Sequence, residues 1–273
     1  MLPRCSSTMA SYRLRWFFGK SSNVMKATEN KSDRTWPLPK HSHAMRMRWH
    51  DLLFMHWPIA PNLLQQHLPN IECDTIDGQA WIGVVPFRMS DVAPRFVPAV
   101  PGLSAFPELN VRTYVTVDGK PGVWFFSLDA TNKLAVRLAR KFFYLPYMDA
   151  RMQMSMAKDG WFSYSSRRTH SGEDPAELEM RYRPTGDSFR AEPGTLEHWL
   201  TARYCLYTQD RHGNILRGEI DHEPWPLQKA EAEVRSNSML SWLDPSSELT
   251  AQEPHLLFSS YVGVRAWLNQ RVA

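Results

Sequence analysis

The sequence predicts a mainly β, single-domain protein whose antiparallel strands curl into a barrel. Three observations lead to this prediction. The chain of 273 residues is 43% hydrophobic and 12% aromatic, which is enough to bury a sizeable core. Its strand-like runs are paired across short turns instead of alternating with helices. One run, residues 108–117, alternates polar and apolar residues regularly, as a strand does.

The first elements of the body are expected to be a short helix and a hairpin. Residues 61–68 start with Pro61, which favours the first turn of a helix. Residues 71–76 and 80–88 flank Asp77-Gly78, a dipeptide typical of two-residue hairpin turns. The proline-rich residues 94–107 then predict a loop, because proline cannot sit in a central strand.

A second hairpin and a longer helix come next. The hairpin joins residues 108–117 to residues 123–128 across Asp118-Gly119. A helix capped by Thr131 or Asn132 is expected to run to residue 143. Its basic residues surround an apolar set that recurs every four positions, formed by Leu134, Leu138 and Phe142.

The second half of the body is expected to add more paired strands. Residues 161–170 pair with 178–184, and residues 204–209 pair with 215–222. A short helix is expected over residues 194–200. Two later stretches, residues 231–237 and 256–267, could each add a strand. Because no repeat or linker divides it, residues 45–273 are expected to form one domain.

The charge of the chain is concentrated at its start. The first 48 residues hold ten Lys and Arg and two acids, whereas the rest, with 22 basic and 26 acidic residues, has a net charge of −4. Since a nucleic-acid binder needs a basic face on its folded domain, no nucleic-acid partner is expected. No apolar run approaches the ~18–20 residues of a membrane span, so no membrane partner is expected either.

The cysteines indicate a reducing compartment. Cys5, Cys73 and Cys205 lie far apart, without the spacing of a disulfide framework or a zinc site. Unpaired thiols of this kind are typical of reducing compartments, so we expect a soluble, cytoplasmic protein.

Residues 1–44 are expected to lie outside the domain. They are rich in Ser, Arg and Lys, and no acid precedes Glu29. Three interpretations stay open. The start site is assigned too far upstream, with Met25 or Met45 the true start; the segment is a disordered tail; or it is a transit peptide, whose usual composition it shares. Organellar targeting by residues 1–28 would require a eukaryotic source.

Motifs for cofactors and metals are missing. The sequence has no GxGxxG fingerprint and no phosphate loop. Residues 102–106 (GLSAF) lack the second glycine of a nucleophile elbow. His50 and His56 are six residues apart, which does not place two ligands on one helix face. We therefore expect neither a cofactor nor a metal.

The strand over residues 108–117 carries the candidate site. A half-exposed strand with its polar face in water is the ordinary explanation of its pattern. A binding role is favoured because the polar side chains have fixed hydrogen-bonding geometry. Glu108 and Arg112 are roughly 13 Å apart along the strand, so they could bracket a small polar ligand. The polar face is formed by Glu108, Asn110, Arg112, Tyr114 and Thr116.

Several short runs, taken in order, resemble a known family over residues 45–268. They are His56-Trp57-Pro58 and residues 83–87 (GVVPF), 106–115 (FPELNVRTYV), 122–130 (GVWFFSLDA), 135–140 (AVRLAR), 145–147 (LPY) and 222–227 (HEPWPL). The chain resembles the YqjF-like family of uncharacterised proteins, a branch of the acetoacetate decarboxylase-like superfamily. The resemblance implies a closed, cone-like antiparallel β-barrel with a few flanking helices and an enclosed cavity. It also implies that the polar face of the strand over residues 108–117 lines this cavity instead of facing bulk water.

The resemblance does not extend to the superfamily's catalytic lysines. Its decarboxylases form a Schiff base through a lysine whose pKa a second lysine lowers. Tyr147 and Met148 stand at the matching positions, and neither can replace them. Lys133 and Lys141 are expected on the surface. We therefore expect no acetoacetate decarboxylase activity, and Glu108, which matches the superfamily's active-site glutamate, is the best catalytic candidate.

Two further residues are candidates beyond the strand. His222, at a strand end, is either a general acid or base or a structural histidine bonded to the backbone. Arg151 either binds a carboxylate with its planar guanidinium or pairs with a surface acid.

The expected function is the binding of a small organic acid or carbonyl compound. The protein would be an enzyme working without a Schiff base, a non-catalytic sensor or carrier, or a structural scaffold on the same fold. Superfamily relatives form oligomers, so a homodimer is a reasonable expectation. The predicted ligand site consists of Glu108, Asn110, Arg112, Tyr114, Tyr147, Arg151 and His222.

Overall fold

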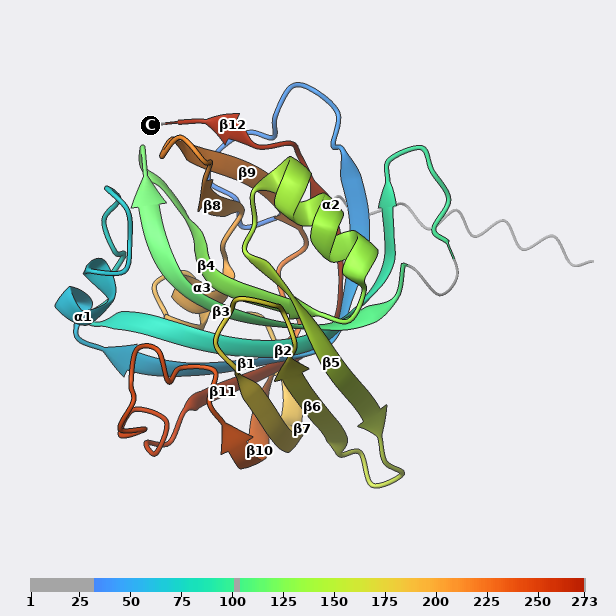
Figure 1. The fold of residues 1–273 in the computed structure, drawn as a ribbon, viewed down its shortest axis with the longest axis vertical. Coiled ribbons are helices and arrows are strands. Elements are labelled where there is room, and N and C mark those ends of the chain that lie inside the picture. The colour runs from blue at the N-terminus through green and yellow to red at the C-terminus, as the bar shows by residue number, and fades with distance from the viewer. Residues whose placement is uncertain (1–31, 101–103, 273) are drawn as a thin grey trace, which may run out of the picture. The chain divides into compact units, whose positions relative to one another are not determined.

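A computed structural model describes residues 32–100 and 104–272 of the chain (Figure 1). The predicted leader lies outside the described residues as far as residue 31. The strands are β1 (Met45–Ile59), β2 (Ala80–Pro94), β3 (Phe106–Val117), β4 (Lys120–Ala130), β5 (Tyr147–Met156), β6 (Phe162–Arg168), β7 (Glu177–Phe189), β8 (Cys205–Gln209), β9 (Ile215–His222), β10 (Leu227–Asn237), β11 (His255–Ala266) and β12 (Gln270–Arg271). The helices are α1 (Pro61–Gln65), α2 (Lys133–Phe143) and α3 (Leu196–Thr201). None of these helices is long and apolar enough to cross a bilayer.

The strands form one sheet that closes on itself twice. Its order is β12-β9-β8-β4-β3-β2-β1-β11-β10-β7-β6-β5. The pairing of β9 with β11 closes a first ring, through β8 and β4 to β1, and the pairing of β4 with β5 closes a second ring, through β6, β7 and β10. Figure 1 shows β8 and β9 on one side of β1, β2 and β3, with β5, β6 and β7 on the other. The mainly β, barrel-like fold predicted from the sequence is confirmed, although β4 pairs in parallel with both β5 and β8.

Strand β3 lies in the wall that the two rings share, and both of its faces are therefore buried. Leu109 and Val111 are fully buried on the side of β5, β6 and β7. On the opposite face Glu108 is 1% exposed and Arg112 is 8% exposed. The alternation predicted from the sequence is present, but both faces are buried from Glu108 to Val115, and of the predicted polar face Thr116 is exposed.

The two largest hydrophobic cores lie on opposite faces of the wall that the rings share. Alternate residues of β1 enter different cores, because successive side chains of a strand point to opposite faces. Leu53 and Met55 pack with residues of β6 and β7 in one core, and Leu52 and Phe54 pack in the other. The second core contains Val136 of α2, so this helix covers the first ring.

Most predicted elements are present, and the differences have physical reasons. The hairpin at Asp118-Gly119 is formed, and the Asn132 side chain caps α2. Residues 71–76 are wrongly predicted as a strand, because β2 pairs with β1 instead, and the turn at Asp77-Gly78 closes only one bridge. Strands β1 and β5 were not predicted. In β1 both faces are largely buried along its second half, which removes the alternation that identifies a half-exposed strand.

Arg34 fixes the segment before β1 to the barrel. Its guanidinium donates a hydrogen bond to the carbonyl of Ile220 (2.8 Å) and forms an ion pair with Glu219. Glu219 also receives Lys120 Nζ at 3.0 Å and the indole N–H of Trp36 at 3.2 Å. These contacts attach the described end of the predicted leader to β9.

Replacing Arg34 by alanine should lower the free energy of unfolding by about 2 kcal/mol, because the buried Glu219 loses its ion pair with Arg34. The loss is limited because Lys120 remains beside Glu219. Urea unfolding measures this change. Arg235→Ala, which removes an exposed ion pair with Glu179, is the matched control and should change stability by less than about 0.5 kcal/mol. Equal effects of the two substitutions would contradict the assigned role of Arg34.

Candidate functional site

Four polar side chains of β3 project into the first ring, and we call them the polar row: Glu108, Asn110, Arg112 and Tyr114. Their neighbours across the sheet are mostly apolar. Glu108 and Asn110 lie opposite Phe87 and Val85 of β2. On β4 they lie opposite Ala130 and Leu128. The polar row is therefore held in a low-dielectric interior, where unpaired charges and hydrogen-bonding groups are costly.

At one end of the polar row, Glu108 is bound by Tyr147. The tyrosine hydroxyl donates a hydrogen bond to Glu108 Oε2 at 2.8 Å. Burial raises the pKa of Glu108 to about 8, although the hydrogen bond from Tyr147 opposes the shift; the charge of Asp129 adds to it. Burial also raises the pKa of Tyr147 well above its ordinary value. At neutral pH this pair is a neutral carboxylic acid beside a neutral phenol.

The turn after α2 positions Tyr147. The residue after α2, Tyr144, has a left-handed backbone with φ of 53°. The chain then enters β5, where Tyr147 pairs with Leu128 of β4. Arg140 of α2 donates to the carbonyl of Tyr147 at 2.7 Å and fixes this corner. Tyr147 thus faces Glu108 from the corner between α2 and β5.

At the other end of the polar row, Arg112, Tyr114 and His56 form a hydrogen-bonded chain. Arg112 Nη2 donates to the Tyr114 hydroxyl (3.3 Å), which lies 2.6 Å from His56 Nε2. Burial, with the charge of Arg112 adding to it, holds the pKa of His56 well below its ordinary value. The direction of the hydrogen bond between Tyr114 and His56 determines the tautomer: a hydroxyl that donates to Nε2 leaves the imidazole proton on Nδ1.

Gly83 makes room for the His56 ring. A Cβ at this position would lie 2.6 Å from two ring atoms of His56. Gly83 pairs with His56 on one side and with Arg112 on the other. A side chain there would separate the imidazole from the polar row.

Arg112 has no carboxylate partner among the described residues. Its guanidinium lies over the Phe54 ring, 5.1 Å from the centroid, and its Nε has no hydrogen-bond partner. Asn110 Oδ1 and His56 Nδ1 are also buried without a partner. By contrast, the neighbouring buried Arg203 is paired with Asp74 at 2.6 Å. Because Glu108 is neutral at pH 7, the polar row holds an uncompensated positive charge.

The other two predicted site residues are not part of the polar row. His222 is buried, and its ring lies 4.6 Å from the Tyr204 ring. Its Nδ1 is 2.7 Å from the carbonyl of Glu223. This geometry fits the structural alternative, and burial lowers the pKa of His222. Arg151 lies on the exposed side of β5, away from the polar row, which disagrees with the prediction that it lines the same pocket.

Sequence reasoning missed His56 as a site residue. The only sequence signal was its place in the His56-Trp57-Pro58 run, because its contact with Tyr114 joins strands that are far apart in the chain. Lys133 and Lys141 are exposed, as predicted, and none of the lysines in the described part of the chain is buried. In these same residues no group of His, Cys, Asp and Glu side chains is arranged to hold a metal.

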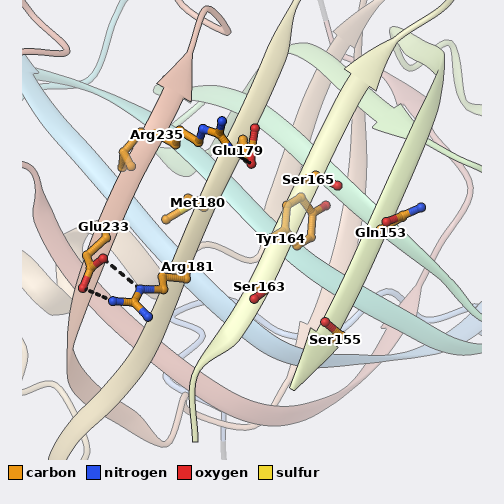
Figure 2. A pocket seen from close by; sticks show the side chains of 11 residues that line it. Gln153, Ser155, Ser163, Tyr164, Ser165, Glu179, Met180, Arg181, Glu233 and Arg235 are labelled. Atoms are coloured by element: carbon orange, nitrogen blue, oxygen red, sulfur yellow. Dashed lines mark hydrogen bonds and ion pairs between the residues drawn. The ribbon is translucent and has the colours of Figure 1, made fainter. Parts of the chain in front are cut away.

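The two larger described cavities lie elsewhere. One of about 500 Å³ lies on the outer face of β5, β6, β7 and β10 (Figure 2). Its charges are already matched, since Arg181 pairs with Glu233 and Arg235 with Glu179. The other, of about 480 Å³, includes Phe189 and Tyr261. Glu108 and Arg112 line neither, so the enclosed cavity predicted from the sequence is not one of these two.

Comparison with known proteins places the chain in a family. The model of the DUF2071 family, described as an uncharacterized conserved protein, matches residues 46–263. The uncharacterized protein YqjF of Bacillus subtilis (strain 168) is 44% identical over 213 residues, which are 78% of this chain and 86% of that protein.

Solved structures agree in fold. The enduracididine biosynthesis enzyme MppR complexed with pyruvate matches with a TM-score of 0.57 at 11% identity, over 88% of this chain and 93% of MppR. An acetoacetate decarboxylase from Legionella pneumophila matches with a TM-score of 0.55 at 13% identity, over the same shares of the two chains. The chain is thus a member of the DUF2071 family, related to YqjF and built on an acetoacetate decarboxylase-like fold.

Proposed function

We propose that the protein binds a small organic anion inside the first ring, with the anionic group on Arg112. The supporting observation is the buried guanidinium of Arg112, which has no carboxylate partner among the described residues and an unpartnered Nε. A buried charge without a partner is strongly destabilising, so a bound anion would offset this cost.

The groups around Arg112 suit a carboxylate. The planar guanidinium can donate two parallel hydrogen bonds to one carboxylate. His56 Nδ1–H is a further donor, and Asn110 Oδ1 can accept a hydrogen bond from a hydroxyl of the same ligand. Phe54 supplies an apolar wall beside the guanidinium.

Glu108 would act on the other end of the ligand. A carboxylic acid kept neutral at pH 7 can donate a proton or a hydrogen bond to a carbonyl oxygen. Tyr147 occupies Glu108 Oε2, which leaves Oε1 for the ligand. The separation of Glu108 and Arg112, roughly 13 Å between Cα atoms, suits a ligand with an acid at one end and a carbonyl or hydroxyl towards the other.

A non-catalytic sensor or carrier is the second candidate function. It is favoured by the lack of a buried lysine in the described interior. Tyr147 is bound to Glu108, the described lysines lie outside, and burial raises the pKa of the Cys205 thiol to about 11. An enzyme built on this site would use proton transfer rather than a covalent intermediate.

Replacing Arg112 by methionine should weaken the binding of small carboxylates by about 10- to 100-fold, the loss expected when a charge-assisted hydrogen-bonded pair is removed. Calorimetric titration with pyruvate, 2-oxobutyrate and octanoate measures this. Pyruvate is chosen because MppR is described in complex with it. Binding without conversion of the acid would favour the carrier over the enzyme.

Arg151→Ala is the matched control for this experiment, since it removes an exposed arginine. It should bind the carboxylates as the wild type does. Unchanged binding by the Arg112 variant, or loss of binding in the Arg151 variant, would refute the proposed anion site.

Glu108→Gln should remove a pH dependence of stability. The folded-state pKa of Glu108 is raised from 4.5 to about 8, so folding takes up a proton between these values. Below pH 4.5 both states are protonated and nothing is lost; as pH rises towards 8 the wild type loses up to about 1.4 kcal/mol per pH unit relative to the variant. Denaturant unfolding from pH 5 to 8 measures this difference. If the stability of the wild type and of the variant changes in parallel with pH, Glu108 titrates normally and the prediction is wrong. Glu253→Gln, which changes an exposed glutamate, is the control.

Acetoacetate decarboxylase activity should be absent. Tyr147 and Met148 replace the lysine pair, and no described lysine is buried. Incubation with acetoacetate should release no carbon dioxide above the uncatalysed rate, and borohydride should trap no adduct. Release of carbon dioxide together with a trapped lysine would overturn this expectation.

A further inference from the structure

The outer side of α2 carries an apolar stripe that is open to solvent. Leu134 is 55% exposed, Leu138 46% and Phe142 55%. They recur at every fourth residue, so they form one continuous face, which we call the α2 stripe. In Figure 1, α2 lies in front of the barrel, and no drawn strand or helix passes over it. The helix predicted from the sequence is confirmed, but this apolar set does not face the core.

The α2 stripe is not needed to attach the helix. Val136 is the buried residue of α2, and Ala135 and Ala139 pack beside it on the core of the first ring. Two basic residues tie the helix down further, Arg137 to the Asp149 carboxylate at 2.7 Å and Arg140 to the carbonyl of Tyr147 at 2.7 Å. The exposed apolar residues are therefore available for another partner.

A basic arc runs along the α2 stripe. At about 100° per residue, the basic side chains fall on one flank of the helix, between the α2 stripe and the buried Val136. The helix contains no acid, and Asp149, bound to Arg137, is the only acid to which the described ion pairs join it. The basic arc consists of Lys133, Arg137, Arg140 and Lys141.

We propose that α2 docks on an anionic lipid surface, with the α2 stripe entering the headgroup region and Lys133 and Lys141 of the basic arc contacting lipid phosphates. A helix with Leu and Phe on one sector and Lys and Arg beside it is the usual form of an interfacial helix. Each basic residue near an anionic surface strengthens binding by a factor of about five. Such a contact lies on the membrane and needs no spanning helix.

A second copy of the chain fits the α2 stripe less well. A symmetric contact between two α2 helices would bring together two basic arcs with no acid on either helix. The α2 stripe consists of three partly exposed side chains, whereas a stable dimer buries about 800 Å² per partner. A lipid surface is opposite in charge and demands no matching shape.

Flotation of the full chain with lipid vesicles tests the proposal. The wild type should bind vesicles of phosphatidylcholine with about 30% phosphatidylglycerol at least tenfold more tightly than phosphatidylcholine alone. Binding should fall when the salt concentration is raised to about 0.5 M, because salt screens the basic arc.

The variants separate the two parts of the surface. Leu134→Ser combined with Phe142→Ser should lower binding to the anionic vesicles at least tenfold without changing the melting temperature, since both side chains are exposed. Lys133→Gln combined with Lys141→Gln should lower it about 25-fold. Met156→Ser, which changes a residue that is 67% exposed on β5, is the matched control and should bind as the wild type does.

Two results would overturn the proposal. If the double serine variant binds vesicles as tightly as the wild type, lipid attraction comes from elsewhere, for example from the basic residues 1–31. If the wild type does not bind vesicles, and light scattering shows a dimer that the double serine variant dissociates, the α2 stripe is a subunit interface.

Discussion

A guanidinium buried among aromatic side chains needs an anion nearby, and the interior of the first ring is arranged around this requirement. Arg112 stays in that interior because β3 lies in the wall shared by two rings. Phe54 and Tyr114 contact its faces, yet neither neutralises its charge. Glu108, the acid on the same strand face, is neutral near pH 7 because burial raises its pKa to about 8. A ligand that brings its own negative charge would complete the arrangement.

Tyr147 determines which chemistry remains open to this interior. The acetoacetate decarboxylase-like superfamily that the sequence resembles has a lysine pair, and the resemblance implies that Tyr147 and Met148 stand at the matching positions. A phenol that donates to Glu108 cannot form an imine, but it holds the carboxyl group in one orientation. The corner between α2 and β5 therefore presents a hydroxyl that donates to Glu108, and the proposal of proton transfer instead of imine chemistry rests on this contact.

The sequence predicted the fold and most elements because the signals were local. The Asp118-Gly119 turn and the cap at Asn132 are fixed by a few neighbouring residues. Strand β1 was missed because burial of both faces along its second half removes the alternation on which prediction depends. The α2 helix was predicted from its apolar set, but Val136, with Ala135 and Ala139 beside it, is what packs on the core. Helical periodicity alone does not tell which of two apolar sectors meets the barrel.

The polar row could be read from the alternation of residues 108–117, whereas its partners could not. His56 of β1 reaches Tyr114 of β3 past the intervening β2, where Gly83 leaves space for the His56 ring. Such contacts depend on strand register, which no local pattern specifies. Arg151 is exposed because it lies on the outward-facing side of β5, between the buried Ala150 and Met152, and this strand was not predicted.

The most direct measurement is a crystal structure of the protein grown at pH 7 and soaked with pyruvate. The account predicts density for a carboxylate within hydrogen-bonding distance of Arg112 Nε, with Glu108 still bound by Tyr147. An Arg112 side chain paired with an acid of the chain itself, or solvated by water alone at saturating pyruvate, would contradict it.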